Sequence, residues 1–143
     1  MLLRWVNDPV VRNNAFRSEE IDSATHHIWL QNRLENSTRC RLFIAETEGG
    51  VPIGQVRFEL QPEGWEIDYS LDGMVRGKGL GPRLLREGLA AFGPFACGQA
   101  VFGRVKSRNA ASCRVFGKMG FAPETGEGEG VLLFRKSSVW VRE

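Results

Sequence analysis

Hydrophobic positions form short, strand-length runs in the middle of the chain and recur at helical spacing on either side. Three runs rich in Ile, Val, Phe and Tyr occupy residues 40–48, 51–60 and 64–71. A Gly-Gly pair joins the first two runs, and a turn over residues 61–64 joins the second to the third. Turns this short connect neighbouring strands that run in opposite directions. We therefore predict a three-stranded antiparallel meander.

Helix signals flank this meander. Asp8-Pro9 is an N-cap followed by proline at the first helical position, and Asp22 or Ser23 can cap a second, longer helix. After the meander, leucines recur along one helical face of residues 81–92. We predict helices over residues 8–14, 22–36, 81–92 and 109–121 and two further strands over residues 100–107 and 127–137. Helices combined with one central sheet make a mixed α+β fold.

The composition is that of an ordinary globular protein. A length of 143 residues suits one domain, so we expect residues 1–143 to form a single domain. No apolar run reaches the roughly 18 residues of a membrane span, and a charge at Arg4 interrupts the N-terminus, unlike in a secretory signal. The 3 cysteines have neither metal-like nor redox spacing. We expect a cytoplasmic protein with reduced thiols, no metal and no membrane partner.

Charge is distributed unevenly along the chain, although the net charge is only +2. Residues 73–120 carry 9 basic residues and 1 acidic residue, whereas residues 1–72 carry 7 basic and 12 acidic residues. A nearly neutral total with one basic region favours a local anionic ligand over a surface that coats nucleic acid. A solvated basic face is the alternative.

A glycine-rich stretch, VRGKGLGPRLL at residues 75–85, connects the meander to the next helix. Backbone N–H groups at the start of a helix are unpaired, and glycines let a phosphate approach them closely. The spacing fits neither a P-loop nor a dinucleotide-binding fingerprint, because no Ser or Thr follows the Gly-Lys pair and no glycine occupies the third fingerprint position. The pattern that remains is Arg76-x-x-Gly79-x-Gly81.

This pattern resembles the Arg/Gln-x-x-Gly-x-Gly/Ala pyrophosphate loop of the GNAT superfamily, the acetyl-CoA-dependent N-acetyltransferases. A second match lies downstream, where Asn109 is followed by Phe116 and then by Gly120 and Phe121, as in the family's late helix. Together with the order of the strands, the two matches cover residues 40–121.

The resemblance implies the GNAT acyl-CoA N-acyltransferase fold. Its central sheet is mostly antiparallel and carries helices on both faces. A bulge would splay the strand at residues 67–71 away from the strand at residues 100–106. The N-terminal edge strand that usually opens the fold is expected to be short or missing here.

The resemblance also implies acetyl-CoA as the coenzyme. Acetyl-pantetheine would lie between the splayed strands, and the N–H groups of the glycine loop would hold the pyrophosphate. The implied coenzyme-binding residues are Tyr69, Ser70, Leu71, Arg76, Gly77, Lys78, Gly79, Leu80, Gly81, Asn109 and Phe116. The acceptor amine would attack directly in a ternary complex, without a metal. The basic region would then serve a coenzyme and not nucleic acid.

The N-terminal third resembles enzymes that acetylate the amino group of a nucleotide-linked amino sugar, of the pseudaminic acid pathway type. They share Trp-x-Asn-Asp-Pro-x-Val-Arg, found here at residues 5–12, and a His three residues before a Trp. The implied substrate-binding residues are Asn7, Arg12, Arg17, His26 and Trp29. Helix caps, core packing and solvated charges explain the same residues equally well.

Two other functions stay open. One is acetylation of a protein N-terminus or lysine, as in ribosomal-protein acetyltransferases of the same superfamily. The other is a non-catalytic acyl-CoA-binding module. The expected partner is a small-molecule amine, and the chain is expected either to form a homodimer or to be part of a longer sugar-nucleotide enzyme.

Glu66 and Tyr69 are the candidate catalytic residues. Glu66 matches an acidic position in the family and shares one strand face with Asp68, and it can deprotonate the amine through a water. Many family members carry Tyr where this chain has Phe116, and that hydroxyl protonates the leaving thiolate. Here we expect the ammonium product, water or Tyr69, the only tyrosine in the chain, to supply this proton.

Overall fold

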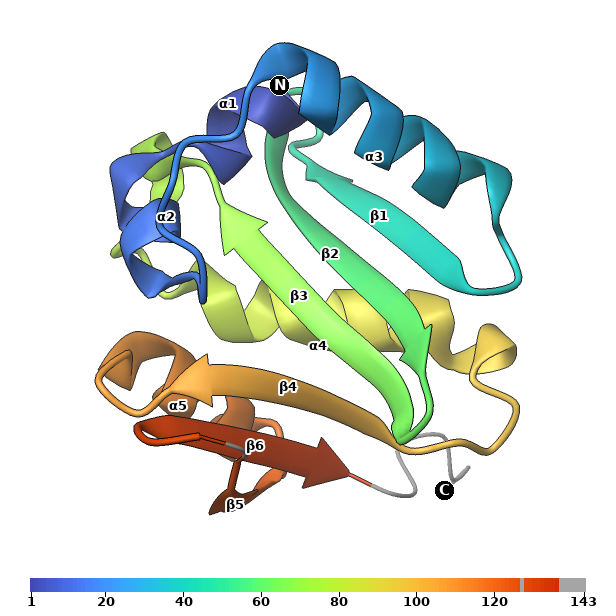
Figure 1. Ribbon diagram of the computed structural model, residues 1–143, viewed down its shortest axis with the longest axis vertical. Helices are drawn as coiled ribbons and strands as arrows, with labels where there is room; N and C mark the ends of the chain where they lie inside the picture. The colour runs from blue at the N-terminus through green and yellow to red at the C-terminus, as the bar shows by residue number, and fades with distance from the viewer. Residues whose placement is uncertain (127, 137–143) are drawn as a thin grey trace.

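Within the residues that the computed structural model describes, 1–126 and 128–136, one mixed sheet of six strands organises the molecule (Figure 1). The strands lie in the order β1-β2-β3-β4-β6-β5. Their bounds are Cys40–Glu46 (β1), Pro52–Gln61 (β2), Gly64–Leu71 (β3), Val101–Lys106 (β4), Ala122–Thr125 (β5) and Val131–Lys136 (β6). Strands β1, β2 and β3 pair in antiparallel fashion, which confirms the predicted meander.

Local capping explains where three of the helices begin. The α-helices are α1 (Leu2–Val6), α2 (Pro9–Asn14), α3 (Ser23–Glu35), α4 (Leu80–Phe92) and α5 (Ala110–Lys118), and the 3₁₀ turns are η1 (Gly73–Val75) and η2 (Gly93–Phe95). The side chains of Asp8, Asp22 and Asn109 accept hydrogen bonds from first-turn N–H groups of α2, α3 and α5. These starts are the ones that the sequence predicts.

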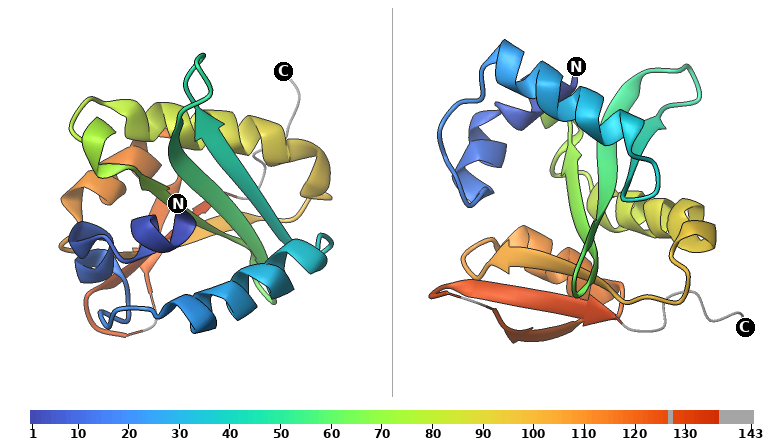
Figure 2. Two further views of the ribbon diagram at one scale, coloured as in Figure 1. Left: turned by 90° about the horizontal axis from the view of Figure 1, so that it is seen from above. Right: turned by 45° about the vertical axis from the view of Figure 1, so that its right-hand side comes forward.

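Helices α3 and α4 cover opposite faces of the meander (Figure 2). Side chains along β2 point alternately to the two faces of the sheet, and on one face Val56 and Phe58 pack in the core with α4. On the other face, the guanidinium of Arg57 lies 4.8 Å from the ring centroid of Trp29 in α3. The expectation of helices on both faces is confirmed.

The sheet splits between β3 and β4. The two strands run parallel and pair only at Trp65 with Val101 and at Glu66 with Phe102. Beyond this point β3 follows β2, whereas β4 continues with β6 and β5, as Figure 1 shows. The expected splay is confirmed. The expected bulge does not appear as an inserted residue in the pairing of β2 with β3, which continues residue by residue past the point where β3 and β4 part.

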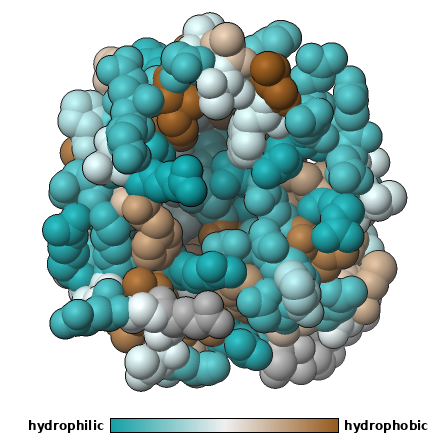
Figure 3. All heavy atoms as spheres, in the orientation of Figure 1, coloured by the Kyte–Doolittle hydropathy of each residue, from teal (hydrophilic) through white to brown (hydrophobic). Residues whose placement is uncertain are grey.

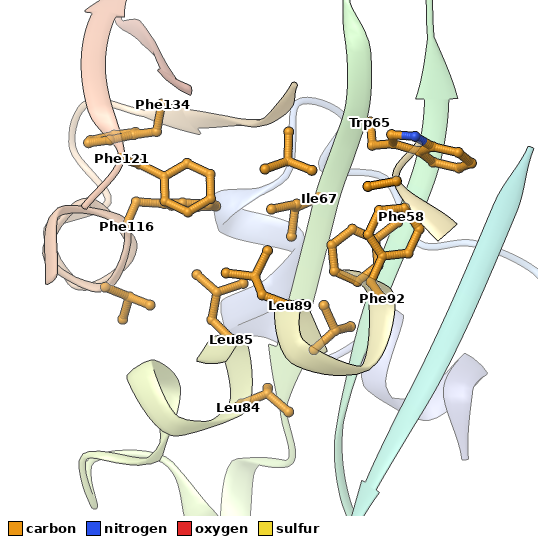
Figure 4. Close-up of a cluster of buried hydrophobic side chains, with 14 of the residues drawn as sticks. Phe58, Trp65, Ile67, Leu84, Leu85, Leu89, Phe92, Phe116, Phe121 and Phe134 are labelled. Carbon is orange, nitrogen blue, oxygen red and sulfur yellow. The ribbon is translucent and has the colours of Figure 1, made fainter. Parts of the chain in front are cut away.

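Aromatic residues on the α4 side hold the two halves of the split sheet together (Figure 4). Phe58 of β2 stacks on Phe92 of α4 with ring centroids 4.0 Å apart. In the β4 half, the ring of Phe116 packs against Phe121 and Phe134 at 5.2 and 5.4 Å. Leucines of α4 join the two groups. This shared core joins the two halves of the sheet on the face that α4 covers and does not extend to the opposite face.

Two short elements, α1 and β5, are not predicted from the sequence. Helix α1 has 5 residues and no side-chain cap, and β5 has 4 residues that are exposed throughout and include Pro123. Elements this short carry little local signal and depend on their neighbours. The last predicted strand, 127–137, is shorter than expected, since β6 begins at Val131; residues 127 and 137 lie outside the described part. In that part, no helix has the length and apolar character needed to cross a bilayer.

Candidate active site

The glycine loop leads from β3 into α4 and leaves the start of this helix open. Gly77 and Gly79 have φ angles of 75° and 73°, in the left-handed region that glycine adopts without strain. Gly79 is the N-cap of α4, and none of the described side chains caps the helix there. The free N–H groups and the positive end of the helix dipole therefore favour a phosphate group at this position.

Hydrogen bonds to Asp72 connect α1 to the loop. Its carboxylate accepts hydrogen bonds from the backbone N–H of Met74 at 3.0 Å, from Nε1 of Trp5 at 2.7 Å and from Nη2 of Arg4 at 2.9 Å. These donors, the Met74 N–H first among them, lower the pKa of Asp72 to about 2. Sequence reasoning missed this pair of Trp5 and Asp72, because the two residues lie far apart in the chain.

Arg76, a predicted coenzyme ligand, connects the loop to α2. Its Nη1 lies 3.0 Å from Oδ1 of Asp8, the N-cap of α2. Burial is the largest single influence on Asp8 and opposes its ionisation, but the hydrogen bond and charge of Arg76 together with the N–H groups of Val10 and Val11 outweigh it and lower the pKa of Asp8. Nη2 of Arg76 is buried without a partner among the described residues and remains able to donate a hydrogen bond.

A cleft of about 1120 Å³ opens between the N-terminal helices, the split in the sheet and α5. Figure 3 shows this face of the molecule hollowed, with mostly hydrophilic side chains around the hollow. The predicted residues that line the cleft are Arg12, Arg17, His26, Trp29, Tyr69, Ser70, Leu71, Arg76, Gly77, Gly79, Leu80, Gly81, Asn109 and Phe116. Of the predicted site residues, Asn7, Glu66 and Lys78 lie outside this lining.

Tyr69 reaches from β3 across the split to α5. Its hydroxyl lies 2.8 Å from Oγ of Ser112, which sequence reasoning missed, and its ring meets Phe116 edge-on at 5.9 Å. Burial raises the pKa of Tyr69, so the hydroxyl keeps its proton at neutral pH. Asn109 caps α5 by accepting from the Ser112 N–H at 3.2 Å. Phe116 is only 2% exposed and belongs to the core.

Glu66 and Asp68 share the α3 side of β3 but differ in depth. Glu66 belongs to the last backbone pair between β3 and β4, and its Oε2 lies 3.5 Å from Nε of Arg104. Burial raises the pKa of Glu66, and this effect exceeds the opposing effect of Arg104. Asp68 lies two residues further on, where the strands have separated, and it lines the cleft.

Two predicted acceptor-binding residues serve the backbone of their own segment. Asn7 donates to the carbonyl of Ile21 and accepts from its N–H, both at 2.7 Å. Arg12 donates to the carbonyls of Val6 at 2.7 Å and of Arg17 at 2.8 Å. Both side chains thus hold the segment that follows α2 in place.

The other three predicted acceptor-binding residues keep groups directed at the cleft. Arg17 is exposed, and its guanidinium has no partner among the described residues. His26 is buried with its ring 5.6 Å from that of Trp29, and burial lowers the pKa of His26.

Among residues 1–126 and 128–136, no three His, Cys, Asp or Glu side chains gather in a way that could hold a metal ion.

Solved structures share this architecture. A ribosomal-protein-alanine N-acetyltransferase from Brucella melitensis aligns with a TM-score of 0.77 and 24% identity over 95% of this chain and 91% of that one. Spermidine N-acetyltransferase from Vibrio cholerae, solved with CoA and spermine, gives 0.77 and 18% over 94% and 85%. A domain from Methanocaldococcus jannaschii gives 0.79 and 18% over 94% and 88%. A comparison with curated proteins returned no match.

The family described as Acetyltransferase (GNAT) domain matches residues 1–122. This range includes the N-terminal helices, the meander, the glycine loop and α5, which together enclose the cleft. The chain therefore belongs to the GNAT family and is an acetyl-CoA-dependent N-acetyltransferase.

Proposed function

We propose that the enzyme acetylates the amino group of a nucleotide-linked amino sugar. The charge of the cleft carries this proposal. Its basic lining residues are Arg12, Arg17, Arg57, Arg76, Arg104, Arg114 and Lys118, and its acidic ones are Glu19, Glu20, Asp22 and Asp68. This excess of cations extends beyond the glycine loop, so it suits an acceptor that carries phosphate groups of its own in addition to the coenzyme.

The coenzyme fits the glycine-loop end of the cleft. The uncapped N–H groups at Gly79 and the following residues would hold the pyrophosphate, and the buried Nη2 of Arg76 would gain a partner there. The backbone of Tyr69 to Leu71 lines the cleft where β3 has left β4, which leaves room for the pantetheine arm. Lys78 lies outside the lining, at the exposed surface, and serves the outer phosphates in this proposal.

Two side chains of this enzyme handle protons in the proposed reaction. The acetyl thioester supplies the activated acetyl group, and the neutral amine attacks its carbonyl carbon. Glu66 takes up the proton that the amine loses, through a water, since the raised pKa of Glu66 suits a base that works near neutral pH. The hydroxyl of Tyr69, held by Ser112, returns a proton to the departing sulfur. In this proposal the Tyr69 hydroxyl replaces the tyrosine hydroxyl that many family members carry at the position of Phe116.

Peptide and polyamine amines are the second candidate class of acceptor. Glu19, Glu20 and Asp22 line the cleft next to one another and would attract a cationic chain. The structural relatives described as ribosomal-protein-alanine and spermidine N-acetyltransferases show that this fold serves such acceptors in other proteins.

A panel of amines distinguishes the candidates. Release of free CoA thiol from acetyl-CoA is measured with UDP-4-amino-4,6-dideoxy sugars, with short peptides that have free N-termini, and with spermidine. Turnover of the nucleotide sugars supports the proposal. Turnover of peptides or spermidine alone overturns it in favour of the second class. Binding of acetyl-CoA without turnover of any amine would indicate a non-catalytic acyl-CoA-binding module.

Arg17→Gln is expected to raise the KM for the nucleotide sugar about tenfold, because a charged hydrogen bond to phosphate contributes roughly 1.5–3 kcal/mol. The KM for the same amino sugar without its nucleotide should stay constant. Arg39→Gln is the matched control, because Arg39 is also exposed but lies outside the cleft lining. Equal effects of Arg17→Gln on both sugars would remove Arg17 from phosphate binding.

Glu66→Gln is expected to lower kcat about tenfold near pH 7. An amine flanked by sugar oxygens has a pKa of roughly 8, so about a tenth of it is neutral at pH 7 and a base there contributes about 1.4 kcal/mol. The loss should shrink at pH 9, where the amine deprotonates unaided. Because burial raises the pKa of Glu66, its contribution fades as the pH falls through that raised value. The pH–rate profile of kcat measures both effects.

Glu63→Gln provides the control for this experiment. Oε2 of Glu63 lies 3.9 Å from Nη2 of the same Arg104, but Glu63 lies in the turn before β3, whereas Glu66 is the residue at which β3 and β4 part. A Glu63→Gln enzyme should keep the unmodified profile. If Glu66→Gln also keeps it, solvent is the base and Glu66 has no role in proton transfer.

A further inference from the structure

Asp68 is the acidic residue that the sheet itself contributes to the cleft lining; the other acidic lining residues, Glu19, Glu20 and Asp22, come from the segment before α3. Asp68 follows Glu66, the last residue of β3 that pairs with β4, by two positions on the same face. Its side chain is 55% exposed, which is twice the 27% of Glu66. Asp68 therefore stands at the point where the strands separate and a substrate can enter.

Neighbouring side chains fix the orientation of this carboxylate. Nε2 of Gln55 donates to Oδ2 of Asp68 at 3.1 Å and to Oγ of Ser70 at 3.2 Å. Because an ionised carboxylate only accepts hydrogen bonds, the nitrogen of the Gln55 amide must face it. Gln55 is itself 6% exposed, so its amide is held firmly by the surrounding packing.

Arg57 approaches the same oxygen. Its Nη1 lies 3.4 Å from Oδ2 of Asp68, and its guanidinium is held between Trp29 and Glu59. Both contacts therefore use Oδ2, and Oδ1 accepts no hydrogen bond from the described residues. The arrangement leaves one fixed acceptor atom at the entrance to the split.

We infer that Asp68 binds the amino group of the acceptor, with Oδ1 as the hydrogen-bond acceptor. An amine or ammonium group is a pure donor in this contact and pairs well with a carboxylate oxygen. Backbone pairing places Ser70 directly opposite Gln55, so this site adjoins the stretch of β3 proposed to hold the acetyl group. Gln55 is the positioning residue, because it acts on the acceptor only through Asp68.

This inference rests on the proposed function only in requiring an amine as the acceptor, whichever amine the panel identifies. It also assigns different roles to two carboxylates of β3. Asp68 binds the amine before reaction, and Glu66, deeper in the split, receives the proton. The two residues should therefore affect different kinetic constants.

Asp68→Asn tests this assignment. We expect the KM for the amine to rise about tenfold or more, because a charge-assisted hydrogen bond is lost. The KM for acetyl-CoA and the acetyl-CoA-induced rise in melting temperature should not change, since Asp68 is remote from the glycine loop in the proposed arrangement. Gln55→Leu should raise the KM for the amine by a smaller factor, about threefold, because Asp68 stays present but loses its fixed orientation.

Glu59→Gln is the matched control. Glu59 is the other carboxylate that contacts Arg57, with Oε1 3.2 Å from its Nε, but it lies outside the cleft lining. If Asp68 served only to hold Arg57, both variants would change the kinetics equally. We expect Glu59→Gln to leave the KM for the amine unchanged.

Each outcome supports or overturns the assignment. An Asp68→Asn enzyme whose KM for the amine stays within twofold of the unmodified value overturns it, as does an equal effect of Glu59→Gln. Asp68→Ala repeats the test without an amide group beside Gln55, and circular dichroism checks that both variants fold. Turnover of peptides in place of nucleotide sugars would overturn the proposed acceptor class but not the role of Asp68.

Discussion

Gly79→Val is expected to abolish the rise in melting temperature that acetyl-CoA produces in the unmodified enzyme. At a hundred times its Kd, a ligand adds about 2.7 kcal/mol of stability, or roughly 10 °C for a domain of this size. Valine strongly disfavours a φ of 73°, so the substitution moves the loop away from the conformation that presents its N–H groups. The space beside Gly79 is open, and the valine side chain would occupy it where a phosphate would lie. Differential scanning fluorimetry with and without acetyl-CoA measures the shift.

Gly98→Val separates loss of binding from backbone strain. Gly98 has a φ of 74°, open space around it, and a place outside the cleft after η2. Both variants should melt at lower temperature than the unmodified enzyme when no ligand is present. Only Gly98→Val should retain the full acetyl-CoA shift. A folded Gly79→Val enzyme that also retains it would show that the loop does not hold the coenzyme.

Gly103→Val is expected to lower the stability of the enzyme by about 3 kcal/mol, the upper end of the range for overpacked cores. A Cβ on Gly103 would lie within 3.0 Å of three atoms of the Phe116 ring. This ring is enclosed by Phe121 and Phe134 and cannot move aside without disturbing both. The close approach of α5 to β4, which forms one wall of the cleft, therefore depends on the absence of a side chain at position 103. Thermal or urea denaturation measures the loss.

Gly117→Ala, one residue after Phe116, is the control for the Gly103 variant. A Cβ there meets nothing within 4 Å, and alanine favours a helix interior by about 1 kcal/mol over glycine. This variant should be as stable as the unmodified enzyme or more so. Adding Phe116→Leu to Gly103→Val should restore part of the lost stability, because the smaller side chain leaves space for the valine. A Gly103→Val enzyme of normal stability would contradict this account of the packing.

Much of the fold follows from signals that act over a few residues. The starts of α2, α3 and α5 follow from the sequence, because the capping side chains of Asp8, Asp22 and Asn109 bond N–H groups only two or three residues away. The meander was predicted because its turns are short. Helix α1 and strand β5 lack such signals, and packing against distant segments decides their formation.

The candidate site likewise combines features that follow from the local sequence with contacts that do not. The glycine loop was recognised from its spacing, and its left-handed glycines and uncapped helix start suit a phosphate. The partners of its residues were not predictable. Arg76 pairs with Asp8, which is 68 positions away, and Tyr69 reaches Ser112, which is 43 positions away. Contacts of this kind depend on how the whole chain is folded.

The spacing of Glu66 and Asp68, two apart in β3, is enough to place them on one face of the strand, because side chains alternate along every strand. Their difference in depth depends on the tertiary structure. The pairing of β3 with β4 ends at Glu66, which faces Arg104, whereas Asp68 lies beyond that point and lines the cleft. The family resemblance implied a splay from residue 67 onward, but no pattern of polar and apolar residues within β3 shows where the strands part, because this depends on how the helices pack against the two halves of the sheet.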